Sequence, residues 1–241
     1  MDHIEFAQRG LHAFLAQELR RRVSAISLST PILDIGCGSG AWLTRLAELG
    51  FSDLVGIDNG SFVDLPISNE TIYYHRADLS AGENLGLSRR FGLITAIEVL
   101  EHLENPGIFW RHIRRSLADD GYVLITTPNI HSIRTRLRYA ATSKLAGFDP
   151  GNALGDPTHI YPVYFVCLQR ILGRYGLEVA DGWTYPLTGG LNAGFLVHAV
   201  ARILATFLPD RYPGDTLCLL IRNQISKSSN TSDPQDHFAV A

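Results

Sequence analysis

A glycine-rich stretch, Leu33 to Gly40 with the sequence LDIGCGSG, constrains the fold of this chain more than any other segment. It continues a short apolar run over residues 32–35 that is typical of a buried strand, and an amphipathic helical pattern follows over residues 41–49. Glycines at such a junction let the backbone turn sharply and approach a ligand closely. Because ligands of open α/β sheets bind at the carboxyl ends of the strands, the stretch predicts a ligand site there.

Strand and helix patterns alternate along most of the chain, which predicts βαβ units, a mostly parallel sheet and helices on both faces. The further expected strands are residues 54–57, 72–77, 91–97, 122–127, 177–183 and 217–221. The expected helices besides 41–49 are residues 3–24, 106–117, 132–145, 164–175 and 194–208. We predict one α/β domain over residues 1–225, with an N-terminal helix within 1–27, a substrate-side insertion at 129–160 and a disordered tail at 226–241.

Composition excludes several classes of protein. Three cysteines without a C-x-x-C pair disfavour a disulfide scaffold and a structural zinc cluster. The net charge of −3 excludes a chain that is basic throughout, as many nucleic-acid-binding proteins are. The N-terminus shows no signal-peptide pattern, and the most apolar stretch, residues 194–209, is shorter than the ~20 residues of a membrane span. We therefore expect a cytoplasmic protein without a transmembrane segment.

Acidic residues follow three successive predicted strands, and they indicate which ligand the glycines receive. Extended to Ala41, the glycine stretch also satisfies the loose G-x-G-x-x-G/A dinucleotide fingerprint. Asp34, however, immediately precedes Ile35 and the first glycine, where a carboxylate would repel a pyrophosphate but suits a cationic ligand with an amino group and a sulfonium centre. That ligand is S-adenosylmethionine. Asp58 is placed to accept hydrogen bonds from ribose hydroxyls, and Asp78 from the adenine amino group.

Taken together, these elements resemble the class I S-adenosylmethionine-dependent methyltransferases. The matching segments are residues 33–40, 55–58, 77–79, 91–103 and 119–129. The resemblance implies a Rossmann-like, doubly wound sheet of seven strands, mostly parallel with an antiparallel last strand. The residues predicted to bind the cofactor are Asp34, Gly36, Gly38, Gly40, Asp58, Asp78, Leu79 and Glu98. The chain departs from the family after Asp58, where residues 59–68 form a poor helix pattern.

The sequence Glu98-Val99-Leu100-Glu101-His102 follows the fourth predicted strand and supplies the candidate catalytic residues. His102, accompanied by Glu101, is the candidate general base for a hydroxyl acceptor. Alternatively Glu98, Glu101 and His102 hold a divalent cation, with His159 as a candidate further ligand. The E-x-x-E-H spacing resembles ubiquinone-biosynthesis O-methyltransferases, the subgroup closest in motif, and small-RNA 2′-O-methyltransferases. In both, the resemblance implies metal-assisted activation of a hydroxyl. In a third interpretation the two glutamates only cap a helix and orient the methionine end of the cofactor.

The segment after the fifth predicted strand is basic. Residues 121–148 contain no Asp or Glu, while Arg134, Arg136, Arg138 and Lys144 are positive. They form either a solvated helix face or a rim that receives an anionic acceptor. RNA is disfavoured as a partner, because it is expected to need a longer basic surface interleaved with exposed aromatics. The apolar residues 194–208 predict burial, a dimer contact, or peripheral contact with a membrane or a lipid-linked acceptor.

The sequence thus predicts an S-adenosylmethionine-dependent enzyme that methylates an oxygen of a small-molecule, quinone-like or glycan-type acceptor. The alternatives are a metal-assisted RNA 2′-O-methyltransferase, an NAD-dependent oxidoreductase, which Asp34 disfavours, and a non-catalytic nucleotide-binding Rossmann module. The identity of the acceptor and the oligomeric state are not predicted.

Overall fold

The computed structural model describes residues 7–23, 26–60, 68–79, 85–149, 158–185 and 211–224. These contain a seven-stranded sheet in the order β3-β2-β1-β4-β5-β7-β6. The strands are β1 (Ile32–Ile35), β2 (Leu54–Asp58), β3 (Ile72–Arg76), β4 (Phe91–Ile97), β5 (Leu117–Pro128), β6 (Leu177–Tyr185) and β7 (Thr216–Asn223). Every pair from β3 to β5 is parallel, and β7 runs antiparallel to both β5 and β6. The predicted mostly parallel sheet with an antiparallel last strand is confirmed.

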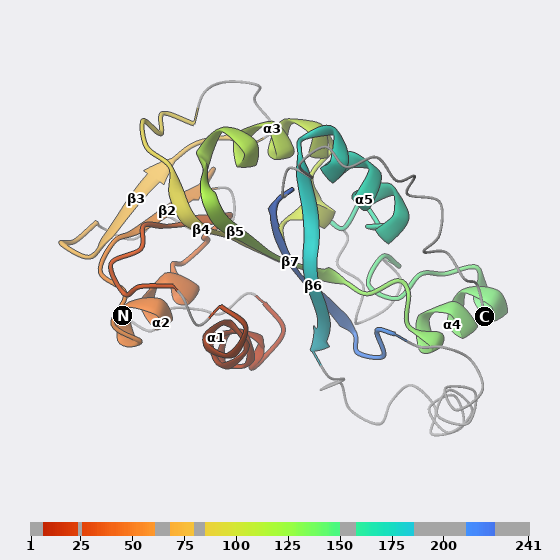
Figure 1. Ribbon diagram of the computed structural model, residues 1–241. Coiled ribbons are helices and arrows are strands. Elements are labelled where there is room, and N and C mark those ends of the chain that lie inside the picture. Colours follow the sequence, from red (N-terminus) through yellow and green to blue (C-terminus); the bar gives the residue numbers. More distant parts are fainter. Residues whose placement is uncertain are drawn as a thin grey trace.

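Helices cover both faces of this sheet (Figure 1). They are α1 (Leu11–Arg22), α2 (Ala41–Glu48), α3 (Pro106–Ser116), α4 (Ile133–Thr142), α5 (Phe165–Arg174) and the short 3-10 helix η1 (Leu100–His102). Helices α1 and α2 lie on one face, and α3 and α5 lie on the other (Figure 1). Within the described ranges, no helix combines the length and the apolar character needed to cross a membrane.

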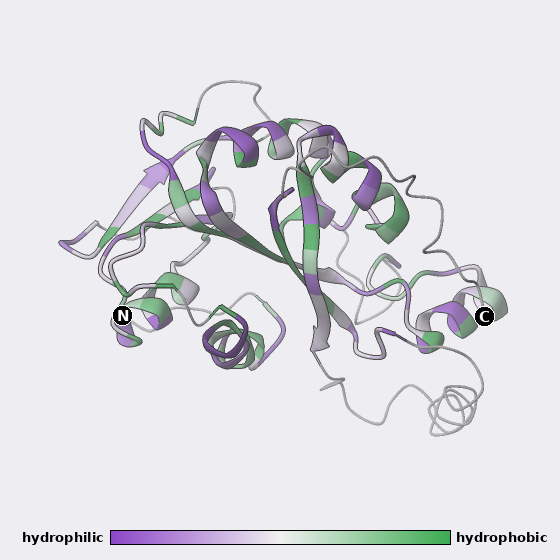
Figure 2. Cartoon of the chain, viewed as in Figure 1, coloured by the Kyte–Doolittle hydropathy of each residue, from purple (hydrophilic) through white to green (hydrophobic). Residues whose placement is uncertain are grey.

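Two apolar cores, one on each face, hold the helices to the sheet. Alternate residues of a strand point to opposite faces, so in β5 Val123 and Ile125 join the core under α3 and α5, whereas Leu124 joins the core under α1 and α2. The four residues of β1 are all buried, as expected for a central parallel strand covered on both sides. Figure 2 shows the hydrophobic residues concentrated along the central strands and the polar residues on the outer helix surfaces.

Predicted boundaries were wrong by three residues or more in three elements. Helix α4 ends at Thr142 rather than at residue 145, because Ser143 turns left-handed at a φ of 57°. The N-terminal helix begins at Leu11 rather than at residue 3, because Gly10 adopts the left-handed region at φ 83° and residues 7–10 form bends and turns. The fifth strand begins at Leu117 rather than at residue 122, since Leu117 already pairs with Phe91 and an irregularity follows before regular pairing resumes. The predicted helix at 194–208 and tail at 226–241 lie outside the described residues, and the single domain over 1–225 stays a prediction.

The strand order reverses direction at β1, which has β2 on one side and β4 on the other. On the two sides of β1, the connections between strands run over opposite faces of the sheet. They therefore separate at this point and leave a crevice at the carboxyl ends of the strands. The fold therefore places the end of the glycine-rich stretch and the end of β4 at one crevice.

Candidate functional site

A cavity of about 560 Å³ lies at the carboxyl ends of β1, β2, β3 and β4. The predicted cofactor-binding residues that line it are Asp34, Gly36, Gly38, Asp58, Asp78, Leu79 and Glu98. His102 and His159 line the same cavity. The acids at the ends of the first three strands and the two histidines therefore line one cavity.

The glycines of the loop have distinct structural roles. Gly36 has a φ of 74°, and a Cβ at this position would lie 2.5 Å from a methyl carbon of Val99. Gly40, the N-cap of α2, has a φ of 77°, and a Cβ there would collide with the Tyr74 hydroxyl. Gly40 does not line the cavity. Glycine is required at this position because the Tyr74 side chain packs against it. Contact between Gly40 and a cofactor stays a prediction.

Asp34 is a buried acid at the floor of the cavity, with 3% of its surface exposed. The Thr95 hydroxyl donates a hydrogen bond to its Oδ1 atom at 2.6 Å, and the Trp42 indole N–H donates to the Thr95 oxygen at 3.2 Å. Burial raises the pKa of Asp34 to about 7, with a smaller contribution from Asp58, although the bond from Thr95 favours the ionised form. A cationic ligand beside this carboxyl would offset the cost of its burial.

Asp58 at the end of β2 joins the glycine loop to the next turn. Its Oδ2 atom accepts a hydrogen bond from the Gly38 amide at 3.0 Å, and its Oδ1 atom accepts one from the Gly60 amide at 2.7 Å. Two such bonds fix the carboxylate and leave it further lone pairs, because a carboxylate accepts about four hydrogen bonds. Asp78 and Leu79 follow β3 along the same side of the cavity.

Glu98 follows β4 in a left-handed conformation, with a φ of 54°, that non-glycine residues rarely adopt. Its amide donates to the Thr126 hydroxyl oxygen at 3.0 Å, and the Thr126 hydroxyl donates to its Oε1 atom at 2.8 Å. Burial raises the pKa of Glu98 to about 7, and the bond from Thr126 opposes this rise. The strained backbone and the reciprocal bonds hold the carboxyl at the cavity wall.

Glu101, His102 and His159 form a compact group, with one candidate ligand atom from each lying within 4.8 Å of the others. The two imidazole rings meet edge to face with their centroids 4.6 Å apart. His102 Nδ1 lies 2.9 Å from the Thr158 hydroxyl, and His159 Nδ1 lies 2.8 Å from the Gly147 carbonyl oxygen. The predicted metal ligands therefore separate: His159 joins Glu101 and His102, whereas Glu98 is not part of this described group.

The group exists because two distant segments are hydrogen-bonded to one another. The carbonyl oxygen of Glu101, on η1, accepts bonds from the amides of Ile160 and Tyr161, both at 2.9 Å. These bonds bring the residues just before them, Thr158 and His159, over the end of β4. Glu101 itself is fully buried and does not line the cavity.

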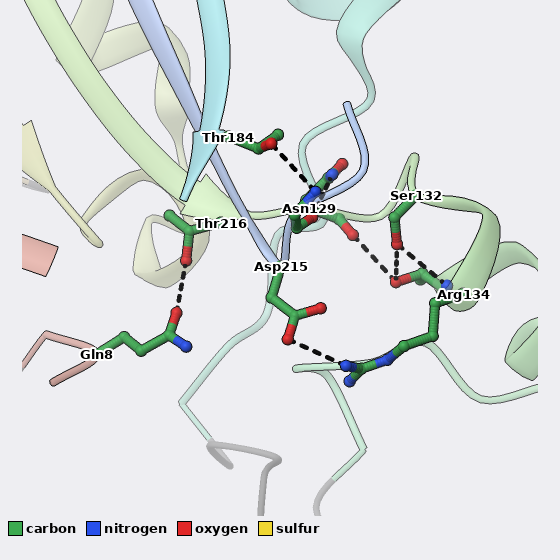
Figure 3. Close-up of polar contacts among 9 residues, drawn as sticks. Gln8, Asn129, Ser132, Arg134, Thr184, Asp215 and Thr216 are labelled. Atoms are coloured by element: carbon green, nitrogen blue, oxygen red, sulfur yellow. Dashed lines mark hydrogen bonds and ion pairs between the residues drawn. The ribbon is translucent and has the colours of Figure 1, made fainter. Parts of the chain in front are cut away.

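Three of the four cations of the predicted basic rim are ion-paired, and they share two carboxylates. Arg134 pairs with Asp215 at 3.1 Å, as Figure 3 shows, and Arg138 and Lys144 both lie 3.3 Å from Asp149. Of the described residues that line the cavity, none is an arginine or a lysine. The ion pair of Arg134 joins α4 to Asp215, the residue before β7, whereas those of Arg138 and Lys144 join α4 and the turn after it to Asp149.

One wall of the cavity, formed by residues 7–8, α1 and α2, was not predicted from the sequence. Gln8, His12 and Trp42 line the cavity, and the His12 ring is 5.6 Å from that of Trp42. Gln8 is held by the Thr216 hydroxyl, which donates to its Oε1 atom at 3.0 Å (Figure 3). A signal was present: His12 stands among the apolar residues on the buried face of α1.

Comparison with known proteins gives a consistent result. Residues 5–181 match the family described as "Methyltransferase domain". The chain is 27% identical over 196 residues to the mitochondrial ubiquinone biosynthesis O-methyltransferase of Dictyostelium discoideum, covering 71% of this chain and 60% of that protein. It is 28% identical over 171 residues to the corresponding Neisseria meningitidis enzyme, covering 64% and 67%. Magnesium protoporphyrin IX methyltransferase from Synechocystis, solved with bound S-adenosylhomocysteine, shares the fold with a TM-score of 0.56 at 15% identity, over 92% of this chain and 90% of that one.

Proposed function

The chain belongs to the methyltransferase-domain family and is a class I S-adenosylmethionine-dependent methyltransferase, and from this premise we propose that it methylates an oxygen atom of a small-molecule acceptor. The observation that carries the proposal is the shared cavity, in which Asp34, Asp58 and Glu98 line the same space as His102 and His159. The half of the cavity with the three acids, the cofactor half, suits a cation that carries hydroxyl and amino groups. The half with the two histidines, the acceptor half, suits a hydroxyl that must lose a proton.

The residues of the cofactor half fit S-adenosylmethionine. When bound, this cofactor supplies a methyl group activated by a sulfonium centre. The buried carboxyl of Asp34 and the partly buried carboxyl of Glu98 would bind its positively charged methionine end. The Asp58 carboxylate would accept hydrogen bonds from the ribose hydroxyls, and Asp78 would accept from the adenine amino group. The absent side chain of Gly36 lets the loop pack closely against Val99, which also lines the cavity.

On the acceptor side, His102 would act as the general base. In the tautomer that carries its proton on Nδ1, which lies 3.3 Å from the Thr158 carbonyl oxygen, Nε2 would take the proton of the acceptor hydroxyl. Transfer of a methyl group from a sulfonium is an in-line displacement, for which alignment and removal of this proton are the main requirements. Glu101, beneath the ring, would stabilise the imidazolium that forms.

A divalent cation is the second candidate for activating the hydroxyl. One carboxylate and two imidazoles are a donor set that suits divalent transition metals. His159 has the outer contact expected of such a ligand, since its Nδ1–H can donate to the Gly147 carbonyl and leave Nε2 unprotonated. A bound cation would lower the pKa of the acceptor hydroxyl. The general-base mechanism and the cation mechanism differ in the role of His102, because a nitrogen that coordinates the cation cannot also accept the proton of the hydroxyl.

Ubiquinone biosynthesis in the names of the relatives favours a quinone-like acceptor over a glycan-type one. RNA is less favoured because three of the four bases after β5 are ion-paired. The chain spans 60% of the Dictyostelium relative, so the acceptor of that protein is carried over only as a proposal. Peripheral membrane contact rests on residues 194–208 and stays a prediction.

Titration calorimetry tests the cofactor half. We expect S-adenosylmethionine and S-adenosylhomocysteine to bind and NAD not to bind. Asp34→Asn should weaken S-adenosylhomocysteine binding at least tenfold, while the matched control Asp119→Asn, an exposed acid far from the cavity, should leave it unchanged. Binding of NAD alone, or equal affinities in both variants, would contradict the assignment.

Release of S-adenosylhomocysteine with a panel of catechols, phenols, glycans and RNA tests the acceptor half. Turnover with a hydroxyl acceptor, lost in His102→Ala, is the expected result. Activity that survives EDTA supports His102 as the base, and activity restored only by Mn²⁺ or Mg²⁺ supports the cation. Methylation of nitrogen or carbon, or binding without any turnover, would refute O-methylation.

A further inference from the structure

His131 lies outside the cavity, yet its ring contacts three consecutive residues at the start of α5. The Phe165 amide donates a hydrogen bond to its Nε2 atom at 3.1 Å. The same nitrogen lies 3.3 Å from the Val163 carbonyl oxygen. The ring stacks on Tyr164, with centroids 5.6 Å apart and an interplanar angle of 25°. Nε2 cannot both accept from the Phe165 amide and donate to the Val163 carbonyl; with the shorter bond, from Phe165, the ring is neutral, its proton is on Nδ1 and Val163 is only a close neighbour.

This contact supplies a cap that α5 does not provide for itself. Tyr164, the N-cap residue of α5, makes no side-chain capping bond. The first amides of a helix have no partner within the helix, and a side-chain acceptor at this point stabilises it. His131, 34 residues earlier in the chain, supplies this acceptor to the Phe165 amide.

Asn129 fixes the backbone of His131. Its side-chain amide donates to the carbonyl oxygens of Tyr212 at 2.6 Å and Gly214 at 2.7 Å, and its Oδ1 atom accepts from the His131 amide at 2.9 Å. Figure 3 shows Asn129 within the polar network that joins the end of β5 to the start of β7. The position of His131 is therefore set by the sheet rather than by α5.

The segment that His131 holds also carries the acceptor-side residues. Thr158 and His159 line the cavity, and the amides of Ile160 and Tyr161 bond to the Glu101 carbonyl. Residues 158–165 are thus anchored at one end to η1 and at the other end, through Phe165, to His131. Loosening either anchor would release the segment that places His159 beside His102.

We propose that His131 is a positioning residue, which fixes the acceptor-side segment 158–165 by capping α5 from the end of the sheet. Its influence on catalysis rests on the proposed function, since it acts through His159 and touches neither cofactor nor acceptor. Its influence on the order of the segment does not rest on that function. The pKa of His131 is lowered, chiefly by burial, which keeps the ring neutral and able to accept at neutral pH.

Hydrogen–deuterium exchange of the full chain tests the proposal directly. In His131→Leu, amide exchange across residues 158–165 should accelerate about fivefold, the factor that corresponds to one capping bond. In His131→Gln, whose side-chain oxygen can replace Nε2 as acceptor, exchange should stay within about twofold of the natural protein. His75→Leu, a histidine removal on the opposite edge strand β3, is the matched control and should not change this segment.

Calorimetry with S-adenosylhomocysteine and a melting curve show that each variant is folded, and the affinity should be unchanged in all of them. If an acceptor is turned over, kcat should fall about fivefold in His131→Leu, recover in His131→Gln, and leave the KM for S-adenosylmethionine unchanged. Unchanged exchange in His131→Leu, or equal acceleration in His131→Gln, would overturn the proposal. Absence of turnover in the natural protein would refute the proposed function, while the exchange result would still decide the role of His131.

Discussion

Thr95 offers the sharpest test of how the cavity binds a cation. It lies fully buried within β4, donates to Asp34 Oδ1 at 2.6 Å and accepts from Trp42 at 3.2 Å. Thr95→Val keeps the shape of the side chain and removes both bonds. A hydrogen bond to a charged group is worth about 1.5–3 kcal/mol, and one pKa unit corresponds to about 1.4 kcal/mol. The variant should therefore raise the pKa of Asp34 by roughly one unit or more.

The consequence for binding follows from the sign of this shift. The pKa of Asp34 is already raised to about 7, so below pH 7 the carboxyl is largely protonated and attracts a cationic ligand less. The affinity for S-adenosylhomocysteine, which keeps the positive amino group, should fall as the pH falls from 8 to 6. With a midpoint near 7, the loss is about tenfold at pH 6. In Thr95→Val the fall should begin about one pH unit higher, so that the affinity at pH 7 drops about fivefold and at pH 9 hardly changes.

Calorimetric titration between pH 6 and 9 measures both curves. Glu98 titrates in the same range and adds to the slope in the natural protein, but Thr95→Val displaces only the contribution of Asp34. Thr95→Ser, which retains the hydroxyl, is the control and should follow the natural curve. An affinity that is independent of pH, or coincident curves for Thr95→Val and the natural protein, would refute the role assigned to Asp34.

Three further perturbations probe other parts of the cavity. Gly36→Ala places a methyl group against Val99 at a φ of 74°, so S-adenosylhomocysteine binding should weaken at least tenfold and the melting temperature should fall, as thermal denaturation will show. Thr126→Val removes both bonds to Glu98 and should weaken the same binding about fivefold at pH 8 by calorimetry; an unchanged affinity would indicate that Glu98 does not contact the ligand. His159→Ala should weaken Mn²⁺ binding at least tenfold in electron paramagnetic resonance titrations if the cation version is correct.

Much of the fold was predictable because its signals are local. β1, β2 and β4 are short apolar runs, and each was predicted at its observed position. The errors fell where a tertiary contact overrides the local pattern. A helical period continues to residue 3, but Gly10 turns left-handed against the Tyr185 hydroxyl, which also bonds to the Arg9 carbonyl.

The sequence by itself determined the side of the cavity that we propose binds the cofactor. Asp34, Gly36 and Asp58 each stand at or just after the end of a strand, and parallel strands that meet at one edge necessarily gather the residues that follow them. Local sequence and sheet topology are then sufficient, and no long-range contact has to be known.

Only the tertiary structure decided the acceptor side. His159 lies beside His102 because the Glu101 carbonyl binds the amides of a segment almost 60 residues later in the chain. Arg134, which the sequence left open as part of an anion-binding rim, is paired with Asp215, which lies 81 residues away. These partners are brought together by loops whose course depends on the whole sheet, and such contacts leave no periodic pattern in the sequence.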